Sequence, residues 1–144
     1  MSGRIEKAGP GATCHLLKFS IRTNIATQPK RMAERLQGIM GCPFLPGYYH
    51  KEIPAWQADL LGMEIYLYEW RGIKNRRILR LHGASANSKF AKYYRQKDAN
   101  FVVTDIGDTI IDLLGANGGG TWYVPSEEDI EAELIYGKRI SGQS

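Results

Sequence analysis

Nine basic residues and no carboxylate lie between positions 71 and 97 of this 144-residue chain. Cations at this density neutralise the phosphates of a nucleic acid or complement an acidic protein surface. Phe90, Tyr93 and Tyr94 lie among them. Aromatic rings can stack on bases, although this helical spacing is more typical of core packing. No helix-turn-helix, zinc-finger, KH or RRM signature accompanies these residues. This segment, the basic window, therefore predicts a binding surface without specifying its partner.

Histidines and cysteines are the next candidates for chemistry. Cys14 and His15 are adjacent, so they would point to opposite faces of a strand, and Cys42 with His50 matches no common zinc pattern. His82 ends an expected strand before a turn, a place where active-site residues do occur, but a surface or hydrogen-bonded histidine is more frequent there. We therefore expect no catalytic residue and a protein that is not an enzyme. A small enzyme with a site near His82 stays open as an alternative.

Carboxylates and glycines could hold a metal or a phosphate. Asp105, Asp108 and Asp112 share one face of an expected helix, but the helix dipole already favours acidic residues in a first turn. The glycines at 118–120 precede Trp122 in an expected strand, with no lysine after them. A phosphate cradle needs a helix N-terminus at that point, so a turn is favoured. We expect neither a metal nor another cofactor.

Length and composition indicate one domain. A chain of 144 residues with 43% hydrophobic residues can bury a core without metal or disulfide support. Residues 1–11 are polar and Gly-rich and are expected to be flexible, whereas 12–140 should form a single α+β domain. No run of about 18 apolar residues and no signal peptide is present. We expect a cytoplasmic protein that does not contact a membrane, with two reduced cysteines, although a disulfide stays open.

Hydrophobic periodicity predicts the elements of this domain. Alternation predicts a strand at 13–23 and a β-hairpin from 63–70 and 76–82, and helical spacing predicts a helix between Thr27 and Gly41. Further strands are expected at 48–53, 100–103 and 121–124, helices at 85–98, 105–114 and 127–136, and either type at 55–61. The last half of 127–136 could also extend as a strand. In the last helix, Ile130 and Leu134 are expected to point inward. The fold class is α+β, with a mainly antiparallel sheet of four or five strands and three or four helices.

The two parts of the chain carry opposite charge. Residues 1–100 hold 17 basic and 7 acidic residues, whereas residues 101–144 hold 2 basic and 8 acidic ones. A small domain with concentrated charge of one sign can bind a complementary protein quickly and selectively. The basic window would bind an acidic partner. The acidic part would bind a basic one, with Trp122 and Tyr123 as aromatic anchors.

The layout is similar to that of the small single-domain immunity proteins of bacterial toxin–immunity systems. The similarity rests on the order strand, helix, hairpin, helix, Gly-rich turn and aromatic strand, followed by Val-Pro-Ser-Glu-Glu-Asp-Ile at 124–130. It implies a cytoplasmic, non-enzymatic protein that binds and blocks one cognate toxin. The net charge of +4 differs from the acidic immunity proteins that neutralise nucleases, which argues against a nuclease target.

The function predicted is inhibition of a cognate bacterial toxin by covering its active site or substrate surface. The alternative is a nucleic-acid-binding module that uses the basic window. Which charged face forms the interface, the partner's identity and the oligomeric state are left open. The expected contacts are Arg71, Lys74, Arg76, Arg77, Arg80, Lys89, Lys92, Arg95, Trp122 and Tyr123.

Overall fold

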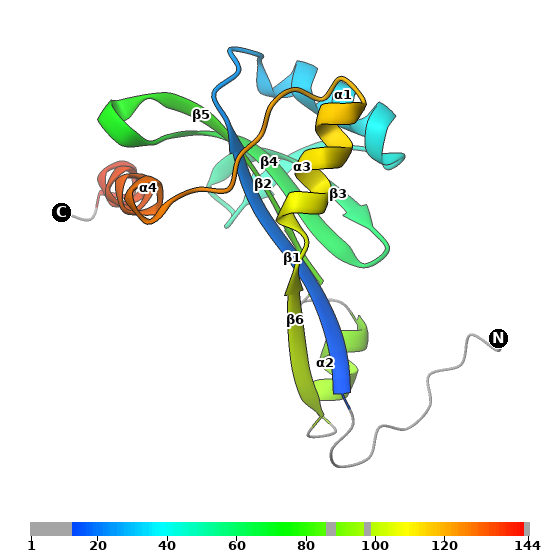
Figure 1. The fold of residues 1–144 in the computed structure, drawn as a ribbon. Coiled ribbons are helices and arrows are strands. Elements are labelled where there is room, and N and C mark those ends of the chain that lie inside the picture. The colour runs from blue at the N-terminus through cyan, green and yellow to red at the C-terminus, as the bar shows by residue number, and fades with distance from the viewer. Residues whose placement is uncertain (1–12, 86–88, 97–98, 143–144) are drawn as a thin grey trace.

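One six-stranded sheet carries the fold, and the computed structural model describes it within residues 13–85, 89–96 and 99–142 (Figure 1). The strand order is β2-β3-β4-β5-β1-β6, and neighbours are antiparallel except for the parallel pair of β1 and β6. The strands are β1 (Thr13–Thr23), β2 (Leu45–Tyr49), β3 (Ile53–Leu60), β4 (Met63–Arg71), β5 (Arg77–Ala84) and β6 (Asn100–Asp105). The helices are α1 (Pro29–Met40), α2 (Lys89–Arg95), α3 (Gly107–Ala116), α4 (Glu127–Ile140) and the short 3-10 helix η1 (Ile73–Asn75).

The α+β class and the mainly antiparallel sheet are confirmed. The described part of the chain holds four α-helices, as expected, and six strands, more than the four or five expected. The predicted strand at 13–23 is β1, and the predicted hairpin is β4 and β5. The helix expected after Thr27 is α1. It begins at Pro29, whose fixed φ suits a first turn, and ends at Gly41, which adopts the left-handed conformation with φ 72°.

The first face of the sheet holds the main hydrophobic core beneath α1 and α3 (Figure 1). Alternate residues of β1, β4 and β5 point into it, as the period of two requires. Helix α1 contributes Met32 and Leu36, and α3 contributes Ile110 and Leu114, each spaced by one helical turn. The strand residues of this core include Phe19, Ile21, Ile65, Leu67, Leu79 and Leu81.

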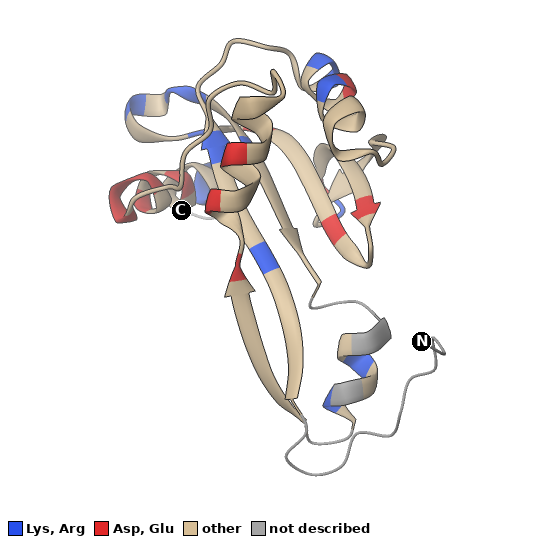
Figure 2. Cartoon of the chain, turned by 45° about the vertical axis from the view of Figure 1, so that its right-hand side comes forward, with Lys and Arg blue, Asp and Glu red and all other residues tan. Residues whose placement is uncertain are grey.

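The second face is covered at its two ends by different helices. At one end α4 packs on β4 and η1, over a cluster that includes Tyr68, Trp70 and Ile78. At the other end α2 packs on β1, where Ala91 covers Cys14. Figures 1 and 2 show α4 and α2 separated along the length of the sheet. The second face therefore presents a stretch of strand surface between its two helices.

Two of the predicted strands were wrong, one open assignment is decided and one predicted helix is shorter. The expected strand at 48–53 is split, because His50 and Lys51 have positive φ and form the turn between β2 and β3. The ambiguous segment at 55–61 belongs to strand β3. The expected strand at 121–124 is reduced to one bridge between Tyr123 and Arg22. The helix expected at 85–98 is the shorter α2, and positions 97–98 lie outside the described residues.

The side chains of both cysteines are buried and unbridged, Cys14 beneath α2 and Cys42 in the main core. In the described part of the chain, no helix is both long enough and apolar enough to cross a membrane. The polar N-terminal segment expected to be flexible, 1–11, lies outside the described residues.

Gly83 of β5 makes a testable packing prediction. A Cβ at this position would lie 2.6 Å from Cε1 of Phe19 and 3.0 Å from Cγ1 of Ile65, inside a closely packed core. We expect Gly83→Ala to lower the free energy of unfolding by about 1–3 kcal/mol in urea denaturation, because overpacking forces neighbours to shift. Gly38→Ala is the matched control in α1, where no atom lies within 4 Å of the added carbon. It should be stabilising by about 0.5–1 kcal/mol, and equal effects of the two variants would contradict the prediction.

Candidate functional site

Two arginines lie directly opposite each other on the second face of the sheet. Arg22 of β1 pairs in register with Arg80 of β5, and Arg80 pairs in turn with Tyr68 of β4. Like charges at directly opposed positions repel each other, so this row needs a counter-ion. The next row of the same face, in register, consists of Ser20, His82 and Tyr66.

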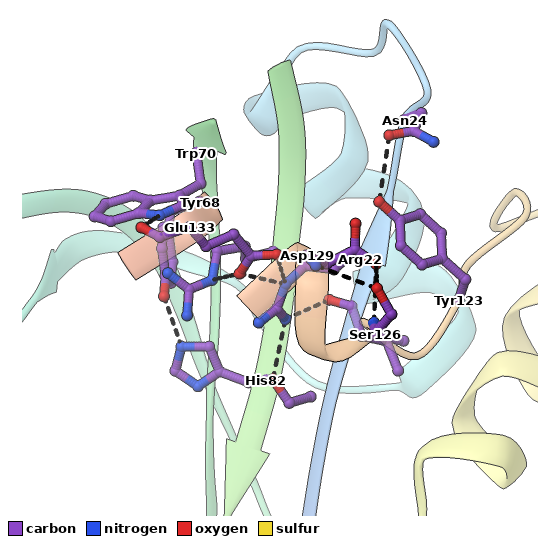
Figure 3. A network of polar contacts seen from close by, with 12 residues as sticks. Arg22, Asn24, Tyr68, Trp70, His82, Tyr123, Ser126, Asp129 and Glu133 are labelled. Atoms are coloured by element: carbon purple, nitrogen blue, oxygen red, sulfur yellow. Dashed lines mark hydrogen bonds and ion pairs between the residues drawn. The ribbon is translucent and has the colours of Figure 1, made fainter. Parts of the chain in front are cut away.

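Glu133 of α4 supplies that counter-ion from above the sheet (Figure 3). Its side chain is 4% exposed, and Nε of Arg22 donates to both carboxylate oxygens, at 2.9 and 3.0 Å. Nε of Arg80 lies 3.4 Å from Oε1 of the same carboxylate. A buried charge is tolerated when it is paired in this way. Glu133 therefore joins α4 to β1 and β5, two strands that are far from it in sequence.

The N-terminus of α4 is formed locally and its middle is held by the sheet. Ser126 and Asp129 form a reciprocal capping box, as their spacing predicted. The acidic first turn is favoured by the helix dipole. One turn further along, the indole N–H of Trp70 donates to the carbonyl oxygen of Glu133 at 3.0 Å. The helix is thus fixed to the sheet by both the backbone and the side chain of one residue.

Arg80 is less fully paired than Arg22. Arg22 donates from Nη1 to the hydroxyl of Ser20 and to the carbonyl of Ile21, each at 3.0 Å. Nε of Arg80 is buried and has no hydrogen-bond acceptor among the described residues. Its guanidinium instead lies 5.3 Å from the ring centre of Tyr68 and 5.1 Å from that of Trp70, a favourable cation–π arrangement. Burial lowers the pKa of Arg80 from its ordinary value, but an arginine stays charged at neutral pH.

Arg22, Arg80 and Glu133 form what we call the ion triad. A cluster of aromatic residues adjoins it. His82 Nε2 lies 3.0 Å from the hydroxyl of Tyr68, and the ring of Tyr49 contacts both side chains. Burial, together with the charges of Arg80 and Arg22, lowers the pKa of His82 to about 3. Burial also raises the pKa of Tyr68 well above its usual value. General acid–base catalysis is most efficient with a pKa near the working pH, and both groups are displaced away from neutrality.

Two hollows flank α4. The larger, of about 780 Å³, lies against its C-terminal half beside the β2–β3 hairpin and is lined by aromatic and proline residues that include Trp70, Tyr136 and Pro54. The smaller, of about 270 Å³, lies on the other flank of the helix. It is bounded by Arg80 and Trp70 from the sheet, and by Ile130, Leu134 and Lys138 from α4.

The prediction that Ile130 and Leu134 point inward was wrong. These side chains are 44% and 60% exposed, and the adjacent Ile135 is 52% exposed. The inward position belongs to Glu133, and with 3.6 residues per turn this rotation moves Ile130 and Leu134 to the flank of the helix. Hydrophobic periodicity assigns apolar residues to the buried side, so it could not detect that a carboxylate occupies that side.

The structure divides the basic window between two places. Arg71, Lys74 and Arg76 lie at the β4–β5 turn, next to the acidic α4, whereas Lys92 and Arg95 lie on α2 at the opposite end of the sheet (Figure 2). The window therefore does not form one continuous basic surface in the described residues.

Three cations of the window contact other groups of the protein. Arg77 pairs with Glu69 and donates to the carbonyl oxygens of Ile25 and Thr27, at 3.1 and 2.8 Å. Arg80 belongs to the ion triad, and Arg95 lies 5.6 Å from the ring centre of Phe101. The side chains of Lys89, Phe90 and Tyr94 lie outside the described residues.

The two expected aromatic anchors differ in exposure. Trp122 is 3% exposed in the main core, and its indole N–H donates to the carbonyl of Gly119, so the prediction that it lies on the surface was wrong. A large apolar ring next to a turn has no periodic pattern that would reveal its burial. Tyr123 is half-buried, and its hydroxyl donates to Asn24.

Groups of three or more side chains with metal-ligand geometry are not found among the described residues. Asp105 instead accepts a hydrogen bond from the backbone N–H of Gly107 at 2.8 Å, as a residue at a helix start does. Gly118 and Gly120 have positive φ, the conformation that a tight turn requires.

Comparisons of the chain with protein-family models, with curated proteins and with solved structures find no match. The site is therefore interpreted from its own geometry.

Removing the buried carboxylate should strongly destabilise the fold. We expect Glu133→Gln to lower the free energy of unfolding by about 3 kcal/mol or more in urea denaturation, because the buried Arg22 and the partly buried Arg80 would lose their counter-ion. Glu128→Gln, at an exposed position of the same helix, is the matched control and should change stability by less than about 0.5 kcal/mol. A loss below about 1 kcal/mol for Glu133→Gln would show that the triad does not hold α4 in place.

The depressed pKa of His82 makes stability depend on pH. Below pH 6.5 the unfolded chain binds a proton at His82, whereas the folded chain does not bind it until about pH 3. The free energy of unfolding therefore falls as the pH falls from 6.5 toward 3. The loss amounts to at most about 1.4 kcal/mol per pH unit. We expect His82→Gln to flatten the stability curve between pH 6.5 and 4, measured by urea denaturation at each pH. His15→Gln, at an exposed histidine, should leave the slope unchanged, and parallel curves for all three proteins would refute the assignment.

Proposed function

We propose that this protein is a non-enzymatic inhibitor that binds one basic partner protein through the exposed surface of α4. The observation that carries the proposal is the exposure of large aliphatic side chains on an acidic helix. Ile130, Leu134 and Ile135 are 44%, 60% and 52% exposed. We call these three residues, with the exposed Glu127, Glu128 and Glu131, the α4 surface.

Exposed aliphatic groups on a well-ordered helix favour a binding role. Each side chain left in water forgoes roughly 25 cal/mol for every Å² of apolar area that burial would remove from water. Several of them together, bordered by charged residues, are typical of a protein interface, in which a few apolar anchors are surrounded by a polar rim. Ion pairing of Glu133 keeps these residues outside, because its carboxylate occupies the inward side of the helix.

Charge defines the chemistry of the partner. Glu127, Glu128 and Glu131 border the aliphatic residues, so a partner with a basic surface would be attracted and correctly oriented. The alternative surface, the basic window, is divided between the β4–β5 turn and α2. The net charge of +4 argued against a nuclease as the target. The charge of the α4 surface itself is negative, so that argument does not apply to a partner that binds there.

An inhibitor is favoured over an enzyme by the chemistry of the second face. Its histidine and its buried tyrosine have pKa values displaced away from neutrality, and both serve in a network of contacts. Together with the architectural similarity to immunity proteins, this makes a bacterial toxin with a basic working surface the partner that we propose.

Binding to the product of the adjacent upstream gene, co-expressed with the tagged protein, is the direct test. We expect an equimolar complex that survives nuclease treatment. Ile135→Asp should weaken its affinity at least tenfold in isothermal titration calorimetry, because it places a charge within the apolar centre of the interface. Leu113→Asp is the matched control, because Leu113 is a 39% exposed leucine on α3, outside the α4 surface, and affinity should stay unchanged.

Reversal of charge separates the two candidate surfaces. Glu131→Lys should slow association with a basic partner, most strongly at low salt, whereas Arg76→Glu should not. The opposite pattern would assign the interface to the basic window. Recovery of nucleic acid instead of protein, lost on nuclease treatment, would replace the inhibitor with the nucleic-acid-binding alternative.

A further inference from the structure

We propose that the smaller hollow beside α4 binds a carboxylate group carried on an apolar tail, and that Arg80 is its cationic partner. The hollow measures about 270 Å³. The inference rests on the charge balance, the donors and the walls of this hollow, and its test needs no partner protein.

The charge balance of the ion triad leaves one cation in excess. Arg22 and Arg80 share the single carboxylate of Glu133, and the adjoining His82 is neutral, so this buried region has one positive charge left over. Lys138 on the rim of the hollow adds another. Three cations and the one carboxylate of Glu133 line the hollow, so its net charge is positive. An anion that enters it would therefore be attracted and would complete the pairing of the partly buried Arg80.

Hydrogen-bond donors identify Arg80 as the group that would meet such an anion. The carboxylate of Glu133 is engaged by Nε of Arg22 through both oxygens, whereas Arg80 approaches it to only 3.4 Å. Nε of Arg80 makes no hydrogen bond to any described residue. The rings of Tyr68 and Trp70 lie against this guanidinium and restrict its movement. A guanidinium held in one orientation is suited to bind a carboxylate through two parallel hydrogen bonds.

The walls and the size of the hollow indicate what the carboxylate is attached to. Trp70, Ile130 and Leu134 line it with apolar surface. An apolar tail of several carbon atoms would bury against these side chains while its acid group reaches Arg80. A volume near 270 Å³ lies at the small end of ligand sites, so the ligand would be a short carboxylic acid or the end of a larger molecule. Inorganic phosphate would gain nothing from the apolar walls.

Titration with hexanoate, followed through the indole N–H resonance of Trp70, tests this inference on the complete chain. We expect a saturable shift of that resonance, because Trp70 forms part of the wall, and no comparable shift with hexanol or inorganic phosphate. Arg80→Met should weaken hexanoate binding at least tenfold, and Lys138→Gln about threefold. Arg95→Met is the matched control, since Arg95 also lies against an aromatic ring but at the other end of the sheet. Its affinity for hexanoate should equal that of the unmodified protein.

Several results would overturn the inference. These are the absence of a Trp70 shift with both hexanoate and a peptide ending in phenylalanine, equal affinity of Arg80→Met for whichever acid binds, or tighter binding of phosphate than of that acid. If Arg80→Met does not fold, Lys138→Gln decides, because its position is exposed, and unchanged affinity there would count against the site. A peptide ending in phenylalanine, compared with its C-terminal amide, separates the two sources of the acid. Binding of the peptide acid alone would assign the hollow to a polypeptide end, and binding of hexanoate would assign it to a free acid.

Discussion

The placement of α4 depends on one interaction, the burial of the Glu133 carboxylate between two arginines. Arg22 and Arg80 lie directly opposite each other in an antiparallel pair, an arrangement that is unfavourable without a shared counter-ion. Glu133 supplies it from the helix, and Trp70 binds the backbone of the same residue. Because this fixes the rotation of α4 about its axis, the same contact decides which side chains line the two hollows and which face solvent.

The charge asymmetry along the sequence does not become an asymmetry between two faces. The acidic start of α4 packs beside the basic β4–β5 turn, where Asp129, Lys74 and Arg76 border a third hollow, separate from the two described above. Much of the opposite charge is therefore brought together within the protein. The remaining cations of the basic window lie on α2, at the far end of the sheet. Counting charges along the chain consequently overstated the continuous basic surface.

Sequence patterns predicted the elements whose core contacts are periodic, and missed those decided by distant partners. Strand β1, helix α1 and the β4–β5 hairpin followed from their spacing of apolar residues. The β2–β3 turn was missed because His50 and Lys51 adopt positive φ without a glycine. The inward side of α4 was missed because it is set by Arg22, which is 111 positions away in sequence. The candidate site was thus the least predictable part, since a buried carboxylate and a buried tryptophan carry no local signal.

The ion triad is better explained by orientation than by stability. A buried ion pair is often no more stabilising than apolar side chains of the same volume, because the desolvation of the charges offsets their attraction. Apolar side chains at all three positions of the triad would also pack together, but they would leave the rotation of α4 less well defined, with Ile130 or Leu134 as competing inward residues. The carboxylate excludes these alternatives, since turning it toward solvent would leave Arg22 and Arg80 opposed and unpaired. A charge, rather than a hydrophobic residue, lies beneath this helix. As a direct consequence, aliphatic residues stay at the surface and a partly paired arginine lies beside a hollow.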